Sequence, residues 1–561
     1  MDKKARKVFE VSWEVCNKVG GIYTVLASKA KLMKDIYKNN YFVIGPYVKN
    51  NALDELDFLE PPNEFRDIFE ELKSLGVYCH FGKWRVEGKP NCILLEFDHL
   101  FNRVDEFKFS FWEHNQIDSL GSSHDFNEPL VFSVAVSYLI ESLEKKSFVN
   151  EKDILHCHEW MTGFSFLRLK NIGSKIKSVF TTHATVLGRS LAGNNHDLYG
   201  NLDKVNVEGE ARRLNVFDKF SSERAMANSC DVFTTVSEIT SYESEKLLGR
   251  KPEVLVLNGV NLSILPNLAK INKIRKVVRP KIIDVINSMS FPSVVKDPLI
   301  YYFGGRYEFR AKGLDVYLDS LIKLNETLVK ENGREVVAIF LLATYNDGLK
   351  NEVLIKHNDY LNVLNRERDF KGIYGSLNDA GLNASKNKLN SYDYRILCSH
   401  KFGDEENDAL IKGIRSRGLD KTEKVKVLVF PTYLDGKDGL LNLTYYEVVC
   451  GCDLGVFPSY YEPWGYTPLE SLSLSIPSIT SMYAGFGRYV KDKSGKGIRV
   501  INEGSRDEFI DELYDFLYDF SKLSFKSFSS ERKASLEVAK MAQWDDLILN
   551  YVKAHNLSID K

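Results

Sequence analysis

The sequence predicts an α/β protein with two domains, each built on a doubly wound parallel sheet. Short apolar, β-rich runs alternate with longer amphipathic stretches along almost the whole chain, a pattern typical of βαβ units. The chain has 561 residues, and one hydrophobic core stops growing at roughly 250–300 residues, so more than one domain is needed. We therefore expect two Rossmann-like domains that face each other across a cleft.

The strands are expected where the apolar runs stand. The first lies within residues 8–15, and others are predicted at 41–44, 93–97, 178–182, 232–236, 299–303, 337–342, 425–430, 454–457 and 478–481. A turn dipeptide, Asn258-Gly259, follows the run 254–257. It predicts a boundary between an N-terminal domain over 1–258 and a second domain over 259–534.

Two further segments complete the expected architecture. Residues 345–394 are rich in Asn, Lys and Asp and predict an exposed helical insertion within the second domain. Residues 535–561 are expected to form a C-terminal helix that crosses back to the N-terminal domain. Its apolar stripe runs through Leu536, Ala539, Ala542, Leu547 and Tyr551, as in a helix with one buried face.

The composition excludes several classes of protein. The formal net charge is −2, from 75 basic and 77 acidic residues, which argues against a nucleic-acid partner held by a broad basic face. Eight scattered cysteines without a Cys-x-x-Cys pair indicate free thiols in a reducing compartment. The longest apolar run, near 130–140, is shorter than the ~20 residues of a membrane span. We expect a soluble, cytoplasmic protein without a signal peptide and without a membrane partner.

Ligands of parallel sheets bind beyond the carboxyl ends of the strands, so the residues that follow each predicted strand are the first candidates for a site. Gly20 and Gly21 precede a helical pattern over 22–33. Two glycines let backbone N–H groups approach an anion at a helix N-terminus, although a purely structural turn explains them equally well. The spacing is not Gly-x-Gly-x-x-Gly, which disfavours a dehydrogenase.

Two other strand ends carry histidines. His158 and Glu159 follow one strand, and His183 follows another, with Arg189 close behind. A histidine after a strand is more often a hydrogen-bonded structural group, and His158 and Glu159 fit that interpretation. His183 and Arg189 are predicted to project a donor and a guanidinium into one site.

The second domain opens with an arginine and a lysine six residues apart. Arg306 stands at the end of the predicted strand 299–303, and Lys312 follows. Two fixed positive charges can stabilise the negative charge that develops on a departing diphosphate. A solvated basic turn is the alternative. The sequence contains no Asp-x-Asp, so neither a metal nor another cofactor is indicated.

The densest motif spans 457–470. Pro463 is predicted to keep Glu462 on a loop, where a charge among aromatic residues needs a polar partner such as a sugar. Thr467 is expected to be a helix N-cap, Pro468 the first helical residue, and Glu470 the end of a capping box. Alternatively, Gly465 and the helix N-terminus bind a diphosphate, and Glu470 accepts both hydroxyls of a ribose.

Together these segments resemble the eukaryotic-type glycogen (starch) synthases, which are retaining glycosyltransferases of family 3 with the GT-B fold. The resemblance runs from about Val8 to the last helix. The matching segments are Glu10-Val11-Ser12-Trp13-Glu14, Val19-Gly20-Gly21-Ile22-Tyr23-Thr24-Val25, His158-Glu159-Trp160, Thr182-His183-Ala184-Thr185-Val186-Leu187-Gly188-Arg189, Gly305-Arg306-Tyr307-Glu308 and Gly455-Val456-Phe457-Pro458-Ser459-Tyr460-Tyr461-Glu462-Pro463-Trp464-Gly465-Tyr466-Thr467-Pro468.

The resemblance implies a role for each matched position. Arg306 and Lys312 would bind the diphosphate, and Glu462 and Glu470 would lie near the donor glucose and the ribose. His183 and Arg189 would flank the transferred sugar, Gly21 would approach the phosphates, and Tyr445 would lie against the uracil. The binding residues implied by the matched motifs are Gly20, Gly21, His158, Glu159, Arg189, Tyr445, Tyr461, Trp464, Gly465, Tyr466, Thr467 and Glu470, and the catalytic ones are His183, Arg306, Lys312 and Glu462.

The resemblance also implies a reaction and its partners. Glucose would pass from UDP-glucose to the 4-hydroxyl at the non-reducing end of an α-glucan, with retention of configuration and without a metal. A priming protein similar to glycogenin and a homo-oligomer are compatible with it. Regulated relatives carry an arginine-dense helix that binds glucose 6-phosphate, whereas residues 521–540 hold a single arginine, Arg532. We therefore expect no activation by this sugar phosphate.

Three alternatives remain open from the sequence. The donor could be ADP-glucose, or the product another glucan. A sugar-nucleotide epimerase with the same fold needs no polymer site. A glucan-binding scaffold without activity is disfavoured because Glu462, Arg306, Lys312 and His183 are all present. For the enzymes we also expect domain closure that brings Arg306 and Lys312 towards His183 and Arg189.

Overall fold

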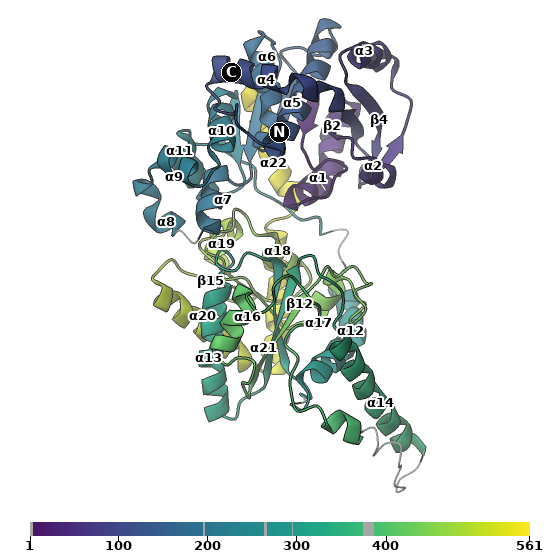
Figure 1. Cartoon of the computed structure of the whole chain (residues 1–561), viewed down its shortest axis with the longest axis vertical. Helices are drawn as coiled ribbons and strands as arrows, with labels where there is room; N and C mark the ends of the chain where they lie inside the picture. The colour runs from purple at the N-terminus through teal and green to yellow at the C-terminus, as the bar shows by residue number, and fades with distance from the viewer. Residues whose placement is uncertain (1–3, 195–196, 263–265, 294, 374–385) are drawn as a thin grey trace. The chain divides into compact units, whose positions relative to one another are not determined.

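The computed structural model describes residues 4–194, 197–262, 266–293, 295–373 and 386–561. The chain divides into two compact units (Figure 1). Unit 1 comprises Met1–Asn261 and Ala542–Lys561, and unit 2 comprises Leu262–Met541. Each unit contains its own sheet.

In the part of the chain that the structure describes, unit 1 contains a nine-stranded sheet with the order β3-β4-β5-β2-β1-β6-β7-β8-β9. All neighbours are parallel except the antiparallel pairs β3/β4 and β4/β5. The strands are β1 (Val8–Val11), β2 (Tyr41–Pro46), β3 (Leu56–Phe58), β4 (Tyr78–Trp84), β5 (Asn91–Glu96), β6 (Ile154–His158), β7 (Lys177–Thr182), β8 (Val232–Thr235) and β9 (Val254–Leu255). The order changes direction between β1 and β6, so the ends of these strands form a switch point where ligands bind in such sheets.

The helices of unit 1 connect these strands. They are α1 (Gly21–Tyr37), α2 (Lys49–Glu55), α3 (Asn63–Ser74), α4 (Val104–Asn115), α5 (His124–Lys145), α6 (Trp160–Asn171), α7 (Val186–Gly193), α8 (Leu198–Asn201), α9 (Val207–Arg213), α10 (Phe217–Ser229), α11 (Glu238–Leu248) and α22 (Trp544–Asp560), with the short 3₁₀ helices η1 (Lys38–Asn40), η2 (Asp98–Arg103) and η3 (Leu202–Lys204). The longest apolar run of the sequence, residues 130–140, lies in α5 and is buried at every position. Among the described residues, no helix is long and apolar enough to cross a membrane.

Unit 2 contains, among its described residues, a six-stranded sheet in which every neighbouring pair is parallel. Its order is β12-β11-β10-β13-β14-β15. The strands are β10 (Leu299–Arg306), β11 (Val336–Ala343), β12 (Val425–Pro431), β13 (Leu454–Val456), β14 (Ser478–Ser481) and β15 (Ile498–Ile501). Counted from the first strand this is the Rossmann order 3-2-1-4-5-6, whose switch point lies between β10 and β13.

The helices of unit 2 are α12 (Leu268–Ser290), α13 (Leu314–Lys330), α14 (Asn351–Ile373), α16 (Ala409–Ser416), α17 (Tyr445–Gly451), α18 (Tyr466–Ser473), α19 (Gly485–Val490), α20 (Arg506–Ser521) and α21 (Phe525–Lys540), with the 3₁₀ helix η4 (Lys491–Lys493). The predicted insertion over 345–394 contains α14, which extends away from the sheet of unit 2 in Figure 1. Its helical character is thus confirmed for α14, while residues 374–385 lie outside the described part.

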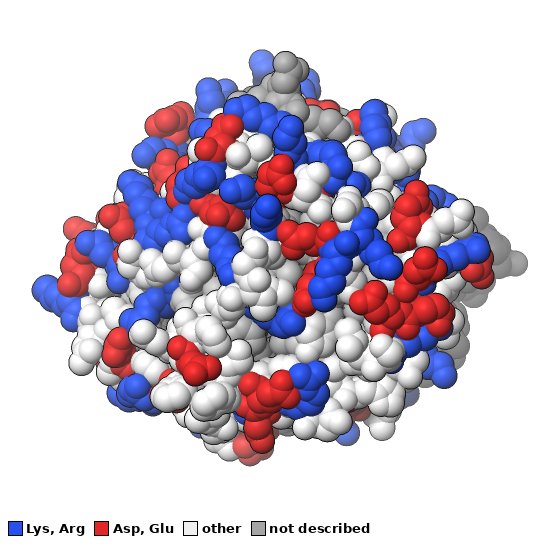
Figure 2. Space-filling model, turned by 90° about the horizontal axis from the view of Figure 1, so that it is seen from above, with Lys and Arg blue, Asp and Glu red and all other residues white. Residues whose placement is uncertain are grey.

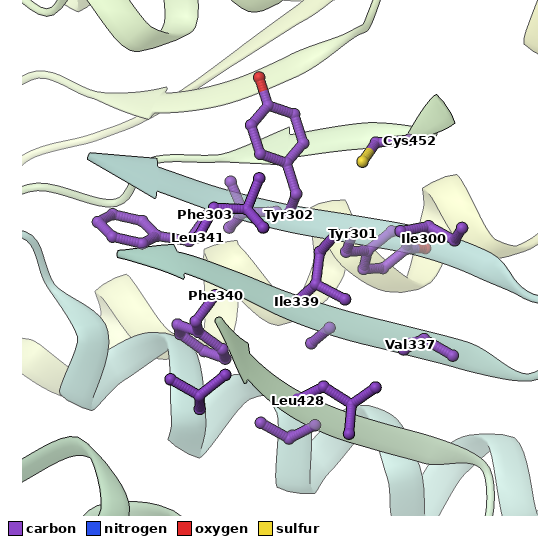
Figure 3. Packing of buried hydrophobic residues seen from close by; sticks show 14 of the residues in the cluster. Ile300, Tyr301, Tyr302, Phe303, Val337, Ile339, Phe340, Leu341, Leu428 and Cys452 are labelled. Carbon is purple, nitrogen blue, oxygen red and sulfur yellow. The ribbon is translucent and has the colours of Figure 1, made fainter. Parts of the chain in front are cut away.

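The core of unit 2 is built by the apolar runs that predicted its strands. Figure 3 shows side chains of β10, β11 and β12, among them Ile300, Phe303, Ile339 and Leu428, packed around the strands. The β10 segment Leu299–Phe303 is buried at every position. Strands buried on both faces read as unbroken apolar runs, which is why the sequence predicts these parallel strands well.

The strands at or next to the sheet edges were harder to predict. β4 carries His80 and Lys83 between apolar residues, and it pairs antiparallel with both neighbours. β15 includes Arg499. Because such strands alternate polar and apolar residues, they leave no continuous apolar run in the sequence. The predicted strand over 8–15 is also shorter than expected, since β1 ends at Val11.

The prediction of a single C-terminal helix over 535–561 is wrong. α21 ends at Lys540, and α22 begins at Trp544. The backbone between them pairs with Val260, whose N–H donates to the carbonyl of Ala542 at 2.8 Å and whose carbonyl accepts from Trp544. A contact with a residue far away in the sequence therefore interrupts the helix, and the apolar stripe does not reveal it. α22 belongs to unit 1, where Trp544 donates from Nε1 to Ser28 Oγ at 2.8 Å.

Figure 2 shows one face of the molecule. Lysine and arginine side chains are interspersed there with aspartate and glutamate side chains, and no broad area of one sign is seen. This mixture agrees with the formal net charge of −2. The face offers no continuous basic surface to a polyanion.

Candidate active site

The switch point of unit 2 is bordered by Arg306 at the end of β10 and by the loop after β13. Arg306 is exposed, and its side chain has no hydrogen bond or ion pair among the residues that the structure describes. Lys312 is only 8% exposed, and its Nζ donates to Glu462 Oε2 at 2.6 Å. A free guanidinium and a lysine–carboxylate pair thus lie at the edge where this class of sheet binds its ligands.

Backbone contacts hold the Lys312 turn and the Glu462 loop together. The N–H groups of Tyr460 and Tyr461 both donate to the carbonyl of Ala311, at 2.9 and 3.1 Å. Gly313 adopts a φ of +65°, and a side chain there would collide with the carbonyl of Pro458. Only glycine allows this close approach without strain. The pairing of Lys312 with Glu462 is therefore a consequence of how the two loops dock.

The helix that follows Glu462 begins earlier than the sequence predicts. α18 starts at Tyr466 with Gly465 as its N-cap, at a φ of +109°, and no side chain caps it. The prediction of Thr467 as N-cap, Pro468 as first helical residue and Glu470 as capping partner is wrong. Gly465 takes the N-cap position because the chain enters the helix through a backbone conformation that favours glycine.

Glu470 is consequently not a capping residue. Its Oε1 accepts a hydrogen bond from the hydroxyl of Tyr446 at 2.9 Å, and Tyr446 is 45% exposed. Tyr445, predicted to contact the base, is half-buried, and its hydroxyl lies over Gly304, where any side chain would collide with it. The sequence did not single out Tyr446, which exposes more of its ring beside Glu470.

The remaining aromatic residues of the motif are mostly internal. Tyr461 and Trp464 are 4% and 3% exposed, and Trp464 packs against Phe486 and Tyr489. Tyr466 and Thr467 are half-buried in the first turn of α18. Tyr461 and Trp464 therefore shape the loop that presents Glu462, and they offer little surface to a ligand.

In unit 1, the first helix begins at the predicted glycine pair, but a carboxylate already occupies part of its N-terminus. Glu14 Oε2 accepts from the backbone N–H groups of Gly20 and Tyr23, each at 2.8 Å. The backbone N–H of Gly20 is thus used in a hydrogen bond within the protein, which contradicts its predicted role in anion binding. Gly21 is exposed, and a Cβ placed on it meets nothing within 4 Å. The space in front of Gly21 remains open to a ligand.

His183 and Arg189 follow β7, as the sequence predicts, and Glu159 connects them. The backbone N–H of His183 donates to Glu159 Oε1 at 2.8 Å. Burial raises the pKa of Glu159, and the positive charge of Arg189 opposes that rise. Arg189 is exposed, whereas His183 is only 7% exposed. Glu159 itself adopts a φ of +66°, a conformation that non-glycine residues rarely hold except at constrained sites.

A fully buried polar cluster lies below His183. Lys29 and Glu10 form an ion pair at 2.5 Å with both side chains inaccessible, and Tyr41 also donates to Glu10. His158 Nε2 lies 2.7 Å from Glu10 Oε1, and His158 Nδ1 lies 2.9 Å from His183 Nε2. Burial opposes the ionisation of Glu10, but Lys29 and His158 outweigh it and hold its pKa well below the ordinary value.

The same cluster contains a possible set of metal ligands in Glu10, His156 and His158. The ammonium of Lys29 already lies against Glu10. Both ring nitrogens of His156 and of His158 have hydrogen-bonding partners. A buried lysine at the carboxylate disfavours a second cation there. The donor set is therefore better described as a hydrogen-bonded hub than as a metal centre.

Two further buried carboxylates support the segment that carries His183. Glu223 Oε2 accepts from the N–H of Val186 at 2.8 Å, and Glu223 Oε1 contacts the hydroxyl of Thr182. Glu243 accepts from Thr185 and from Tyr199. Burial, with the neighbouring Glu159, raises the pKa of Glu223 to about 8. A carboxyl group with such a pKa is protonated at neutral pH.

The sequence thus located the strand-end residues but not their supports. Glu10, Glu14, Glu223 and Glu243 were not predicted to be functional. A charged residue inside an apolar strand, as Glu10 is in β1, is a signal of a buried pair because an unpaired charge there is costly. For Glu14 and Glu223, the sequence offers no comparable signal.

Two Rossmann-like sheets, one of them with a cationic switch point, are the architecture of the GT-B glycosyltransferases. The catalytic domain of starch synthase IV from Arabidopsis thaliana, solved with ADP and acarbose, matches with a TM-score of 0.54 at 14% identity, covering 99% of this chain and 100% of that one. This likeness shows the fold. The chain has the fold of this class of glycosyltransferases.

Comparison of sequences defines the family. The model of the family described as glycogen synthase matches residues 10–366 and 384–561. The liver glycogen [starch] synthase of Homo sapiens is 32% identical over 587 residues, 99% of this chain and 83% of that protein. Glycogen [starch] synthase isoform 2 of Saccharomyces cerevisiae is 30% identical, over 100% of this chain and 87% of the yeast protein. The chain belongs to the glycogen synthase family, as the resemblance of its motifs predicts.

Proposed function

We propose that this glycosyltransferase transfers glucose from UDP-glucose to the non-reducing 4-hydroxyl of an α-1,4-glucan, with retention of configuration. The observation that carries the proposal is the switch point of unit 2. It presents an exposed Arg306 without a partner among the described residues and a Lys312 bound to Glu462 at 2.6 Å. Cleavage of a sugar nucleotide requires cationic groups at the departing diphosphate, and this edge of the sheet supplies them.

The leaving group would be stabilised by the protein alone. Arg306 offers a fork of donors that matches phosphate oxygens, and Lys312 adds a point charge. The N-terminus of α18, where Gly465 is the N-cap and no side chain accepts from the helix, adds the positive end of the helix dipole, which favours an anion. Because these groups neutralise the diphosphate without a bound cation, we propose that the reaction needs no metal.

The sugar and the nucleoside would be bound by the carboxylates of the motif. Glu462 would accept hydroxyls of the glucose, and His183 and Arg189 would contact the same sugar. Glu470, already paired with the Tyr446 hydroxyl, would accept the ribose hydroxyls. The exposed ring of Tyr446 lies beside Glu470, so it is a better platform for the base than the half-buried Tyr445.

We propose that glucose 6-phosphate does not activate the enzyme. The single arginine of α21, Arg532, is 9% exposed and donates to the Ser475 carbonyl and to Asn272 Oδ1. Burial, together with the nearby Arg275, lowers its pKa to about 10, and one of its nitrogens is buried without a partner among the described residues. Arg275 and Arg279 are already engaged by Asp453. A helix with one buried guanidinium is a poor receptor for a sugar phosphate.

The remaining partners follow from the same proposal. The acceptor would be an α-glucan, started by a priming protein similar to glycogenin, and assembly into a homo-oligomer is compatible with it. The eight cysteines are free thiols, which fits the reducing environment of the cytoplasm.

The decisive measurement is the transfer of labelled glucose onto glycogen from UDP-glucose and, separately, from ADP-glucose. Each reaction is run with EDTA and with or without glucose 6-phosphate. Incorporation from UDP-glucose that is insensitive to both additions is the expected result. Preference for ADP-glucose would reassign the donor. If nucleotides bind but neither donor transfers glucose, the proposal is contradicted and an epimerase or a scaffold becomes the better assignment.

A further inference from the structure

The hydrogen bonds between Glu10 and His183 form a chain with only one consistent direction. Glu10 is a buried carboxylate that accepts from Lys29 and Tyr41. His158 Nε2 lies 2.7 Å from the same carboxylate. An ionised carboxylate can only accept, so His158 must carry its proton on Nε2. Burial lowers the pKa of His158, so the ring is neutral at pH 7, and its unprotonated Nδ1 can only accept.

This direction extends to the residue at the strand end. His158 Nδ1 lies 2.9 Å from His183 Nε2, so His183 must donate from Nε2. Nδ1 of His183 is then the unprotonated nitrogen, and it has no hydrogen-bond partner among the described residues. Burial, together with His158 and Lys29, lowers the pKa of His183 well below its ordinary value. His183 is therefore neutral, and one ring nitrogen remains as an acceptor.

We propose that Glu10 is a positioning residue for His183: through His158 it fixes the Nε2–H tautomer and leaves His183 Nδ1 as an acceptor for a hydroxyl of the donor sugar. The inference rests on the proposed function only for the identity of that hydroxyl. Without Glu10, either tautomer of His158 satisfies the remaining contacts. When His158 carries its proton on Nδ1, His183 must carry its own on Nδ1, and that nitrogen no longer accepts a hydrogen bond.

Each charged or titratable group that faces His183 comes from a known element and has a known contact. Glu10 comes from β1, Lys29 from α1 and His158 from β6, and Arg189 and Glu159 act from α7 and from the N-cap of α6. The Glu159 carboxylate is used by the backbone N–H of His183. Glu159 therefore orients the backbone at His183, while Glu10 determines which nitrogen of the His183 ring carries the proton.

A second chain in the same hub supplies an internal control. Tyr37 bonds to His555 Nδ1 at 2.9 Å, His555 Nε2 to His156 Nδ1 at 3.0 Å, and His156 Nε2 to Thr181 Oγ1 at 2.7 Å. This chain continues from Thr181 to Thr234 and ends on the carbonyl of Phe180. It does not include His183. Disturbing it tests whether any damage to the hub has the same effect.

The tautomer can be measured directly in the unaltered enzyme. The ring nitrogens are observed by NMR after labelling the 11 histidines with ¹⁵N, and the His183→Asn variant assigns the resonances of His183. We expect a protonated Nε2 and an unprotonated Nδ1 at neutral pH. A protonated Nδ1, or an average of both tautomers, would overturn the inference whatever the enzyme transfers.

The double variant Glu10→Gln/Lys29→Met tests the cause. It removes both charges together, so neither is left unpaired in the interior, and glutamine offers an N–H as well as a carbonyl to His158. We expect the His183 resonances to shift towards averaged tautomers. Tyr37→Phe, which removes the donor to His555, should leave the tautomer of His183 and the transfer rate unchanged. An unshifted His183 in the folded double variant would contradict the proposal.

Donor analogues separate positioning from general damage. With UDP-glucose, the double variant should lose about ten-fold in kcat/KM, as expected for one hydrogen bond, while binding of free UDP stays the same. Among monodeoxy analogues of UDP-glucose, the one that lacks the hydroxyl bound by His183 should show no difference between the two enzymes. An equal loss with every analogue would indicate a structural effect alone. If the unaltered enzyme transfers no sugar, the proposed function fails, and the NMR experiment still decides the tautomer.

Discussion

The ammonium of Lys312 lies 2.6 Å from the carboxylate of Glu462, although 150 residues separate them in the chain. Lys312 is the sixth residue after Arg306 at the end of β10, and Glu462 lies in the loop after β13. These strands are neighbours at the point where the strand order of unit 2 reverses. The pair therefore joins a cation with a carboxylate at the position where such sheets bind a nucleotide.

Replacing Lys312 by methionine should abolish most of the transfer activity. The cation would act on the charge of the departing diphosphate, and removal of one such group costs about 10²–10³ in kcat. Lys312→Arg, which keeps the charge, should retain more activity. Steady-state transfer assays measure both. Lys323→Met is the matched control, because Lys323 pairs with Asp511 on the surface of the same unit. Comparable losses in Lys312→Met and Lys323→Met would exclude a specific role for Lys312.

Gly21→Ala should reduce activity without reducing stability. A Cβ at Gly21 meets nothing within 4 Å, and alanine is the better helix former. The midpoint temperature of thermal unfolding should therefore be unchanged or slightly higher. If a phosphate approaches this backbone, the added methyl group should weaken the use of the donor by about ten-fold, because a loss of 1.4 kcal/mol is a factor of ten. Gly20→Ala is the contrasting variant, since its Cβ would press to 3.0 Å from Glu14 Oε1 and should lower stability. Full activity of the Gly21→Ala variant would show that Gly21 does not contact the donor.

Glu223 should make the stability of unit 1 fall as the pH rises. Burial raises its folded-state pKa from 4.5 to about 8, so the folded protein binds the extra proton. The stabilising contribution is complete below pH 4.5 and is lost as the pH rises to about 8. In this window Glu223 adds a slope of ~1.4 kcal/mol per pH unit.

Glu223→Gln should remove that slope, because its amide can replace the protonated carboxyl group towards Thr182 and Val186. Denaturant unfolding between pH 5 and pH 8 measures the difference between the two proteins. We expect the variant to be increasingly more stable than the parent as the pH rises. Parallel pH profiles would show that Glu223 is ionised in the folded protein.

Glucose 6-phosphate should leave the transfer rate unchanged at any concentration of UDP-glucose. The physical reason is that α21 provides one arginine, Arg532, already bonded to Ser475 and Asn272. A titration of the sugar phosphate into the transfer assay measures this, with inorganic phosphate as the anion control. A several-fold rise in activity that Arg532→Gln abolishes would show that the buried guanidinium is a regulatory site after all.

The sequence by itself determined the architecture and which residues stand at the strand ends. The unbroken apolar runs of β10, β11 and β12 predict parallel strands, because strands buried on both faces leave no alternation. Residues that follow such strands must lie at one edge of the sheet, so the sequence alone was enough to propose Arg306, Glu462 and His183 as site residues. Pro463 likewise keeps Glu462 on a loop, as predicted.

Only the tertiary structure decided which groups these residues contact. Lys312 pairs with Glu462, Glu14 occupies the amide of Gly20, and Val260 interrupts the C-terminal helix. The capping box at Thr467 fails because Gly465 begins the helix first. Each outcome depends on atoms brought together from distant parts of the chain. Local sequence patterns record which side chains are suited to burial or to turns, but hydrogen-bond partners are fixed by distances that exist only after the strands have been placed side by side.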